Sequence, residues 1–124
     1  MNVPNHTQAA RIRHDIVNAC CNRTPKAWRG NSYSARVVTD DTRTFSQLFY
    51  QLVHWDTTIA EISVYGGVIS VTYFDARYIS STTRGFQSRI LKALVELVGS
   101  DHPDVVAISQ ELGKPTHSRG VYTG

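Results

Sequence analysis

Two alternating runs on either side of a glycine pair constrain the fold of this chain more than any other feature. Residues 57–65 (TTIAEISVY) place apolar side chains on one face of a strand, namely Ala60, Ile62 and Val64. Residues 68–74 (VISVTYF) also alternate, and one face carries Ile69, Val71 and Tyr73. The glycines at 66 and 67 accept positive φ without a steric penalty, as a tight turn requires. We therefore predict a β-hairpin over residues 57–74.

The stretch after the hairpin, SSTTRGFQSRILKAL (80–94), has the pattern of an amphipathic helix. Its apolar residues recur at spacings of three and four and fall on one stripe, formed by Phe86, Ile90, Leu94, Leu97 and Val98. A hydroxyl side chain can cap the first turn, and we assign the N-cap to Ser81, Thr82 or Thr83. Gly99 can adopt a left-handed conformation and end the helix. Such a helix would bury its apolar stripe on the hairpin.

The N-terminal segment predicts a second helix. Apolar residues occur at helical spacing within residues 6–21, and Asn5 or Thr7 can cap the first turn. Arg11 and Asp15 stand four positions apart, which makes them an i, i+4 ion pair worth a few tenths of a kcal/mol on an exposed helix.

Strands are favoured in most of the remaining chain. One strand is indicated by the alternation of Tyr33, Ala35 and Val37. Residues 44–53 (TFSQLFYQLV) fit a helix by spacing and a strand by aromatic and β-branched content. After a turn at 101–104, the sequence predicts a strand, a turn at 113–115 and a second extended segment.

Together these elements predict an α+β fold. A small antiparallel sheet of about four to five strands would pack against the amphipathic helix of the C-terminal half, with an N-terminal helix added. We expect a single domain over residues 1–124, with a basic helix in residues 1–24 and an α+β core in residues 33–124.

The location of the protein is indicated by what the sequence lacks. There is no run of about 18 apolar residues, and the N-terminus has no apolar segment typical of a secretory signal. Cys20 and Cys21 are adjacent, and adjacent cysteines rarely form a disulfide because its geometry would be strained. We therefore expect reduced thiols, a cytoplasmic location and no membrane partner.

Positive charge is concentrated in the first part of the chain. Residues 1–36 hold six arginines and lysines against one aspartate, whereas the rest of the chain carries a net charge of −2. A basic face can contact nucleic-acid phosphates or an acidic protein. The plainer interpretation is a solvated helix followed by a basic loop. The candidate contact residues are Arg11, Arg13, Lys26, Trp28 and Arg29.

Patterns typical of catalytic and metal sites do not occur in the sequence. The histidines and cysteines show no Cys-x-x-Cys, His-x-x-x-His or His-Glu-x-x-His spacing. No nucleophile elbow, phosphate loop or dinucleotide fingerprint is present either. We therefore expect no catalytic residues, no metal and no cofactor, and we predict that the protein is not an enzyme.

The richest candidate ligand site lies between the hairpin and the helix. Residues 73–86 (YFDARYISSTTRGF) place aromatic rings and arginines beside hydroxyls at a helix N-terminus, where free N–H groups favour an anion. The candidate residues for binding an anion or ligand are Arg77, Tyr78, Ser81, Thr82, Thr83 and Arg84. The alternative is a helix cap with core aromatics. Similarly, VHWDTT (53–58) is either an edge turn with a half-buried Trp55 or the wall of a ligand site.

Several of these motifs occur in a known order. A T-x-I-A strand is matched by Thr57, Ile59 and Ala60. A following S-x-T-T-[K/R] helix start is matched by Ser80, Thr82, Thr83 and Arg84. Over residues 33–115 the chain resembles a family of small uncharacterised proteins of bacteriophages and other mobile elements. It departs from the family pattern at Phe86 and Ser88, where an arginine and an asparagine are expected. The resemblance implies an accessory protein that acts inside a bacterial cell, with no known catalytic residues.

Three functions remain open from the sequence. The leading prediction is a non-enzymatic phage or mobile-element accessory protein that binds and inhibits a host factor, foremost a defence complex, as an anti-CRISPR inhibitor does. The second is a nucleic-acid-binding accessory protein that uses the basic N-terminal segment. The third is sequestration of a small nucleotide signal. The expected partner is a host protein or nucleoprotein complex in the bacterial cytoplasm, and a homodimer would cover the edges of the sheet.

Overall fold

The computed structural model describes residues 3–40, 47–113 and 121–124. After a 3₁₀ turn at Asn5–Thr7, the elements are α1 (Gln8–Cys20), β1 (Trp28–Arg29), β2 (Tyr33–Asp40), β3 (Gln47–His54), β4 (Thr57–Tyr65), β5 (Val68–Asp75), α2 (Ser81–Val98), α3 (Pro103–Leu112) and β6 (Val121–Tyr122). The predicted α+β class and the N-terminal helix are therefore confirmed.

The sheet is antiparallel and has six strands in chain order, from β1 to β6. It exceeds the predicted four to five strands because two short strands, β1 and β6, extend its edges. The predicted hairpin is confirmed, since β4 pairs with β5 around the glycine pair 66–67, and both glycines have positive φ. A bulge at Thr72 shifts the alternation, so Phe74 rather than Tyr73 follows Val71 on the buried face.

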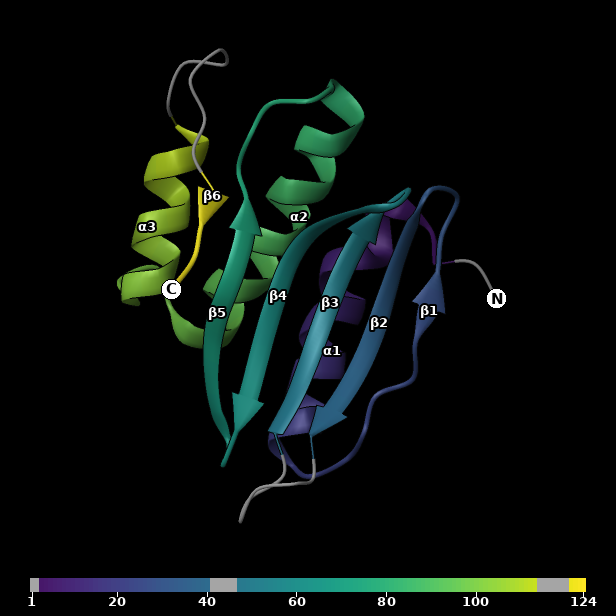
Figure 1. The fold of residues 1–124 in the computed structure, drawn as a ribbon, viewed down its shortest axis with the longest axis vertical. Helices are drawn as coiled ribbons and strands as arrows, with labels where there is room; N and C mark the ends of the chain where they lie inside the picture. Colours follow the sequence, from purple (N-terminus) through teal and green to yellow (C-terminus); the bar gives the residue numbers. More distant parts are fainter. Residues whose placement is uncertain (1–2, 41–46, 114–120) are drawn as a thin grey trace.

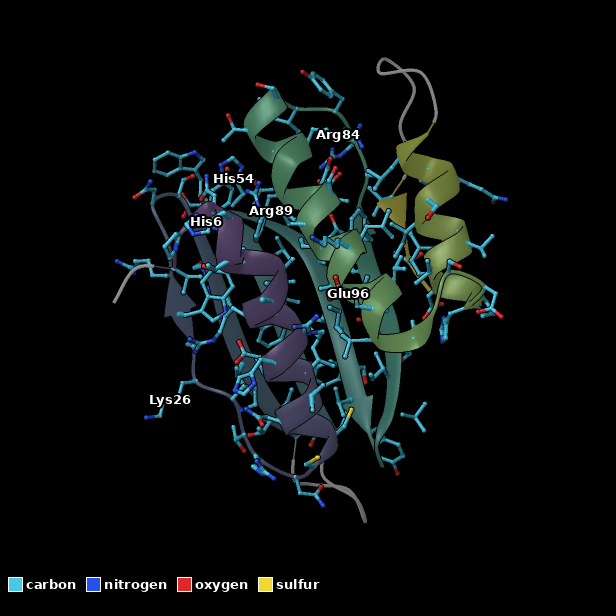
Figure 2. All side chains as sticks on the ribbon, turned by 180° about the vertical axis from the view of Figure 1, so that it is seen from behind. His6, Lys26, His54, Arg84, Arg89 and Glu96 are labelled. Carbon is cyan, nitrogen blue, oxygen red and sulfur yellow. The ribbon has the colours of Figure 1, made fainter. Side chains whose placement is uncertain are left out.

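In the described part of the chain, helices cover one face of the sheet and not the other. Figure 1 shows α1 behind β2 and β3, and α2 behind β4 and β5. Seen from behind in Figure 2, the two helices lie side by side over the sheet. The predicted stripe of α2 faces the core, because Phe86, Ile90 and Leu94 are fully buried. The opposite face of the sheet carries polar side chains, such as Gln51, which donates to Glu61 at 2.8 Å.

A buried hydrogen-bond network joins α1 to the sheet. Asp15 is 2% exposed and accepts from the Tyr50 hydroxyl at 2.6 Å and from the Trp28 indole N–H at 3.1 Å. The predicted pair with Arg11 is present, with Nε 3.0 Å from Oδ1. Burial, and then the Asp15 carboxylate, raise the pKa of Tyr50 well above its ordinary value. The hydroxyl therefore remains a donor, and the network ties α1 to β1 and β3.

The C-terminal segment differs from the prediction. Residues 103–112 form α3 and not a strand. The ring Nδ1 of His102 accepts from the Asp104 N–H at 3.1 Å, and Pro103 stands in the first turn, where its missing N–H is not needed. The β-branched run that predicted a strand is instead the apolar side of a helix. Its buried members are Val105 and Ile108.

The ambiguous segment is a strand where it is described. Gln47 to His54 form β3, which pairs with β2 on one side and β4 on the other along its whole length. These two ladders favour the extended conformation over the helix that the apolar spacing also permitted. Residues 44–46 and 114–115, where part of that segment and most of the predicted turn fall, lie outside the described residues.

The helix caps also differ in part from the prediction. Thr7 is the N-cap residue of α1, as one of the two predicted alternatives had it, but its hydroxyl donates to the Pro4 carbonyl and makes no cap hydrogen bond to the helix. The N-cap of α2 is Ser80, and not Ser81, Thr82 or Thr83. Its Oγ accepts from the Thr83 N–H at 3.2 Å. The extended backbone of Ser80 suits this role, because a cap residue stands just outside the helix.

Candidate functional site

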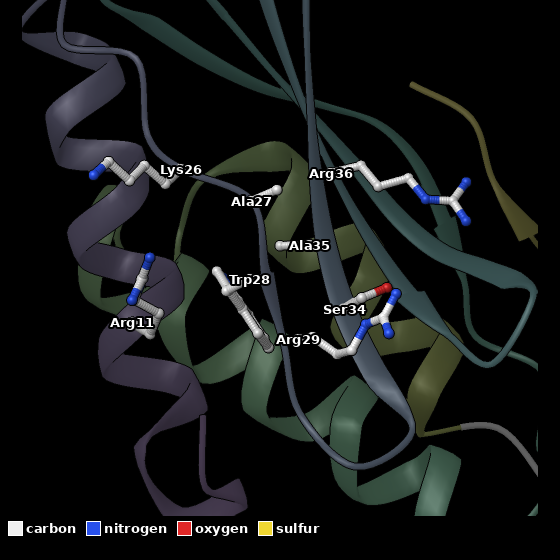
Figure 3. A pocket seen from close by; sticks show the side chains of 8 residues that line it. All are labelled: Arg11, Lys26, Ala27, Trp28, Arg29, Ser34, Ala35 and Arg36. Atoms are coloured by element: carbon white, nitrogen blue, oxygen red, sulfur yellow. The ribbon is translucent and has the colours of Figure 1, made fainter. Parts of the chain in front are cut away.

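A basic hollow lies at the outer edge of the sheet, around β1. Its volume is about 560 Å³, and it is lined by Arg11, Lys26, Ala27, Trp28, Arg29, Ser34, Ala35 and Arg36. Figure 3 shows Arg11 and Lys26 near α1. Arg29 and Arg36 lie farther from this helix, across β1 and β2. Four of the eight lining residues are cationic and none is acidic. We call this hollow the basic groove.

Strand register brings part of this charge together. Trp28 pairs with Ala35, and both point into the core. Because side chains alternate along a strand, Arg29, Ser34 and Arg36 lie on the sheet face without helices. Within the described part of the chain, no salt bridge joins the exposed cations of the groove to a carboxylate. Their positive charge is therefore directed to solvent.

Four of the five residues predicted for a basic contact surface line the groove, three of them with a cationic side chain. Lys26 and Arg29 are exposed there. Arg11 lines it as well, although its guanidinium is held by Asp15. The prediction missed Arg36, because this arginine joins the others only through the pairing of β1 with β2.

Of the other two predicted contact residues, Arg13 lies outside the groove and Trp28 lines it only from the core. Arg13 forms an ion pair with Glu96, which links α1 to α2 away from the groove. Trp28 is only 7% exposed, and its indole N–H donates to Tyr50 Oη at 2.8 Å in addition to Asp15. This ring lines the bottom of the groove from within the core. It therefore supports β1 and offers little surface to a ligand.

A second, smaller hollow continues the basic groove. Its volume is about 260 Å³, and it shares Arg29, Ser34 and Arg36 with the groove. Its lining also includes Trp55 and Asp56, which form the two-residue turn between β3 and β4. We call these two residues the tryptophan turn. The side chain of Trp55 lies in solvent, since the residue is 71% exposed and not half-buried as expected.

The backbone of Trp55 is strained. Its φ is +56°, in the left-handed region that large side chains rarely adopt. Glycine is usual at such a position of a two-residue hairpin turn. The N–H of Trp55 donates to the Ser32 carbonyl at 2.7 Å, which holds the tryptophan turn against the turn between β1 and β2. An exposed aromatic ring is thus fixed in a conformation that costs free energy.

His54 connects the same turns to α2. Its Nδ1 lies 2.8 Å from Thr83 Oγ1, its Nε2 lies 3.1 Å from Ser32 Oγ, and its ring stacks on Tyr33 with centroids 4.6 Å apart. Burial lowers the pKa of His54, and the positive charge of Arg89 lowers it further. The folded state therefore favours the neutral ring. Its contribution to stability is present above the ordinary histidine pKa and is lost as the pH falls.

The four hydroxyls at the start of α2, in residues 80–83, have separate surroundings. Ser80 is the cap, and Thr83 is buried beside His54. Ser81 and Thr82 are exposed, and the carbonyl of Thr82 accepts from the Tyr33 hydroxyl at 3.2 Å. Two of the four hydroxyls therefore maintain the structure, and two face solvent.

The arginines of the predicted anion site have contacts within the protein. Arg77 donates to both oxygens of Asp75, at 2.9 and 2.7 Å, and this carboxylate is buried. These hydrogen bonds raise the pKa of Arg77 above its ordinary value. Arg84 lies over the Tyr78 ring, 5.6 Å from its centre, and contacts the carbonyl of Ala76 at 3.4 Å. The anion site at these residues stays a prediction.

An apolar surface adjoins the tryptophan turn on its other side. Ile79 is 54% exposed and lines a hollow of about 250 Å³ together with Trp55, and its chain neighbour Tyr78 is 42% exposed. We call Trp55, Tyr78 and Ile79 the apolar patch. Trp55 therefore belongs both to this patch and to the hollow that continues the basic groove.

Comparisons with family models, with curated proteins and with solved structures find no match to this chain. Among the described residues, no group of three or more histidine, cysteine or acidic side chains is placed to hold a metal ion. None of the helices in the described ranges is long and apolar enough to cross a membrane. Cys20 and Cys21, at the end of α1, are free thiols.

Proposed function

We propose that this protein binds nucleic acid through the basic groove. The observation that carries the proposal is that Lys26, Arg29 and Arg36 all line the basic groove, without a salt bridge to any described carboxylate. Cations that line one groove can contact several phosphates, and the release of counterions then favours binding. Arginine also offers paired donors that match phosphate oxygens. This was the second function expected from the sequence.

Charge reversal in the groove tests the proposal. The double variant Arg29→Glu and Arg36→Glu should bind a short oligonucleotide at least about tenfold more weakly at about 50 mM salt, because two attractive interactions with phosphates become repulsive. The slope of log affinity against log salt should fall by about 1 for each phosphate that the variant no longer neutralises. Fluorescence anisotropy over a salt series measures both quantities.

A matched control separates the groove from net charge. The double variant Arg23→Glu and Lys92→Glu changes the charge by the same amount at exposed positions outside the groove. Both double variants should melt close to the unaltered protein, because exposed charges contribute little to stability. Equal weakening of binding in the two would contradict a localised site. Absence of any binding by the unaltered protein at low salt would remove the proposal.

We also propose a second candidate function, recognition of a protein partner through the apolar patch. Tryptophan, tyrosine and arginine are enriched in interface hot spots, and Arg84 lies against the patch over the Tyr78 ring. Such a partner agrees with the leading expectation from the sequence, a mobile-element protein that inhibits a host defence complex. That role was expected from the small single domain, the absence of a catalytic motif, the uneven charge and the family resemblance.

Charge placed in the apolar patch tests this second candidate. Ile79→Glu should reduce capture of a protein partner from bacterial lysate by about tenfold or more, because a charged side chain would replace an apolar one in an interface hot spot. Val106→Glu is the matched control, since Val106 is an exposed apolar residue of α3 away from the patch. Quantitative mass spectrometry of nuclease-treated captures compares them. Equal capture by both variants would contradict a role for the patch.

A further inference from the structure

We propose that the nucleic acid held in the basic groove is single-stranded and that the indole of Trp55 stacks on one of its unpaired bases. This inference rests on the proposed function and specifies the class of nucleic acid that the same site takes. It is carried by the position, exposure and backbone conformation of Trp55, which the charge of the groove does not explain.

The proposed binding surface extends from the basic groove to the tryptophan turn. The basic groove and the smaller hollow share Arg29, Ser34 and Arg36, so the two adjoin each other at the edge of the sheet. Cations lie at one end, where Lys26 lines the groove. Trp55 lines the other end. A strand whose phosphates contact the arginines can therefore extend a base toward the indole.

The indole of Trp55 is exposed to solvent. A buried tryptophan stabilises a core, as Trp28 does at 7% exposure, but Trp55 is 71% exposed. Its nearest aromatic neighbour, the ring of His54, is tilted by 34° with centroids 6.2 Å apart, so the two rings do not stack. The indole therefore has surface available for a planar ligand. Proteins that bind single strands pair a positive groove with such aromatic platforms.

Hydrogen bonds hold the tryptophan turn in one conformation before any ligand binds. The positive φ of Trp55 is unfavourable for any residue with a bulky side chain, and a glycine there would be free of that strain. The turn is nevertheless fixed by the 2.7 Å hydrogen bond from Trp55 N–H to the Ser32 carbonyl, and by the contact of His54 with Ser32. A rigid platform gives up little conformational freedom when a base stacks on it. Strain kept at an exposed residue is characteristic of binding sites.

A single strand fits this surface better than a double helix does. In a double helix each base is stacked on its neighbours, so an indole reaches a base face only after a costly unstacking. Single strands offer their base faces directly, and every base has such a face. The arginines of the groove would contact the phosphates of either form. Trp55 is the element that distinguishes the two.

Binding to matched oligonucleotides tests the inference. The probes are a thymidine oligonucleotide of about 12 nucleotides and a blunt duplex of the same length, both at about 50 mM salt. We expect at least about tenfold tighter binding of the single strand, together with quenching of tryptophan emission. Trp55→Asn should remove the quenching and weaken single-strand binding about tenfold, while duplex binding stays unchanged. Asparagine is chosen because it tolerates positive φ.

The melting temperature of Trp55→Asn and the single-strand affinity of Trp55→Phe serve as controls. The melting temperature of Trp55→Asn should equal or exceed that of the unaltered protein, because the substitution relieves strain and removes a solvent-exposed ring. Trp55→Phe keeps an aromatic face and should retain most of the single-strand affinity.

The outcomes distinguish this inference from the proposed function. Equal affinity for duplex and single strand, with no effect of Trp55→Asn, would overturn the stacking role and leave the basic groove as a phosphate site. Binding of neither probe would overturn both proposals and leave the protein partner as the remaining function. A decrease of affinity in Trp55→Phe as large as in Trp55→Asn would also overturn the stacking role.

Discussion

Asp15→Ala should lower the free energy of unfolding by about 3–5 kcal/mol, as the removal of one partner from a buried charged network does. Asp15 is almost fully buried, and its carboxylate accepts from Tyr50, Trp28 and Arg11. Without this carboxylate, the Tyr50 hydroxyl has no acceptor in the core, and a small cavity opens between α1 and the sheet. Denaturant unfolding followed by circular dichroism measures the destabilisation.

Two controls identify the cause of that destabilisation. Asp15→Asn keeps the shape and one carbonyl acceptor for Tyr50, so it should cost less than Asp15→Ala. Arg13→Ala removes the exposed ion pair with Glu96 from the same helix and should cost less than about 1 kcal/mol. Similar costs for Asp15→Ala and Arg13→Ala would contradict the assignment of Asp15 to a buried network.

The buried network around Asp15 could be predicted from the sequence only in part. The i, i+4 spacing of Arg11 and Asp15 predicted an ion pair, which is present. It did not predict that the carboxylate would be buried, because Trp28 and Tyr50 reach Asp15 only through the pairing of β1, β2 and β3. Local spacing identifies neighbours on one helix, whereas burial depends on the elements that pack against it.

The hairpin and the stripe of α2 could be predicted because their signals are local. Alternation around 66–67 and apolar residues at helical spacing each specify one buried face. The segment that became α3 was mistaken for a strand because valine and isoleucine favour strands as isolated residues. Pro103 followed by Asp104 marked a helix start, and the spacing of Val105 and Ile108 fits one turn of helix.

The candidate site was predicted in part. The charge count located Lys26 and Arg29, but Arg36 belongs to a strand and joins them by register. The exposure of Trp55 could not be read from sequence either, since tryptophans in turns are more often packed against their hairpin. Trp55 has a positive φ, which favours glycine, and this can be recognised only when the backbone conformation is known. Of the four hydroxyl residues at 80–83, Ser80 caps α2 and Thr83 makes a buried contact with His54.

Phe86→Ala should lower the free energy of unfolding by about 3–5 kcal/mol, because the burial of the ring is removed and a cavity remains. Phe86 is fully buried, and its ring lies 4.6 Å from that of Tyr33 and 6.5 Å from that of His54, measured between centroids. It therefore fills the space where α2 meets the ends of β2 and β3. Because His54 holds Ser32 and Ser32 holds Trp55, this ring also supports the tryptophan turn.

Two variants of α2 show whether the cavity is the cause. Phe86→Leu keeps an apolar side chain in the same space and should cost about 1.5 kcal/mol or less, because part of the volume remains filled. Ser88→Ala changes an exposed position of the same helix and should alter stability by no more than about 0.5 kcal/mol. Thermal and denaturant unfolding of the three variants give the comparison. A cost for Phe86→Ala below about 1 kcal/mol, or one equal to that of Ser88→Ala, would mean that α2 does not present this face to the sheet.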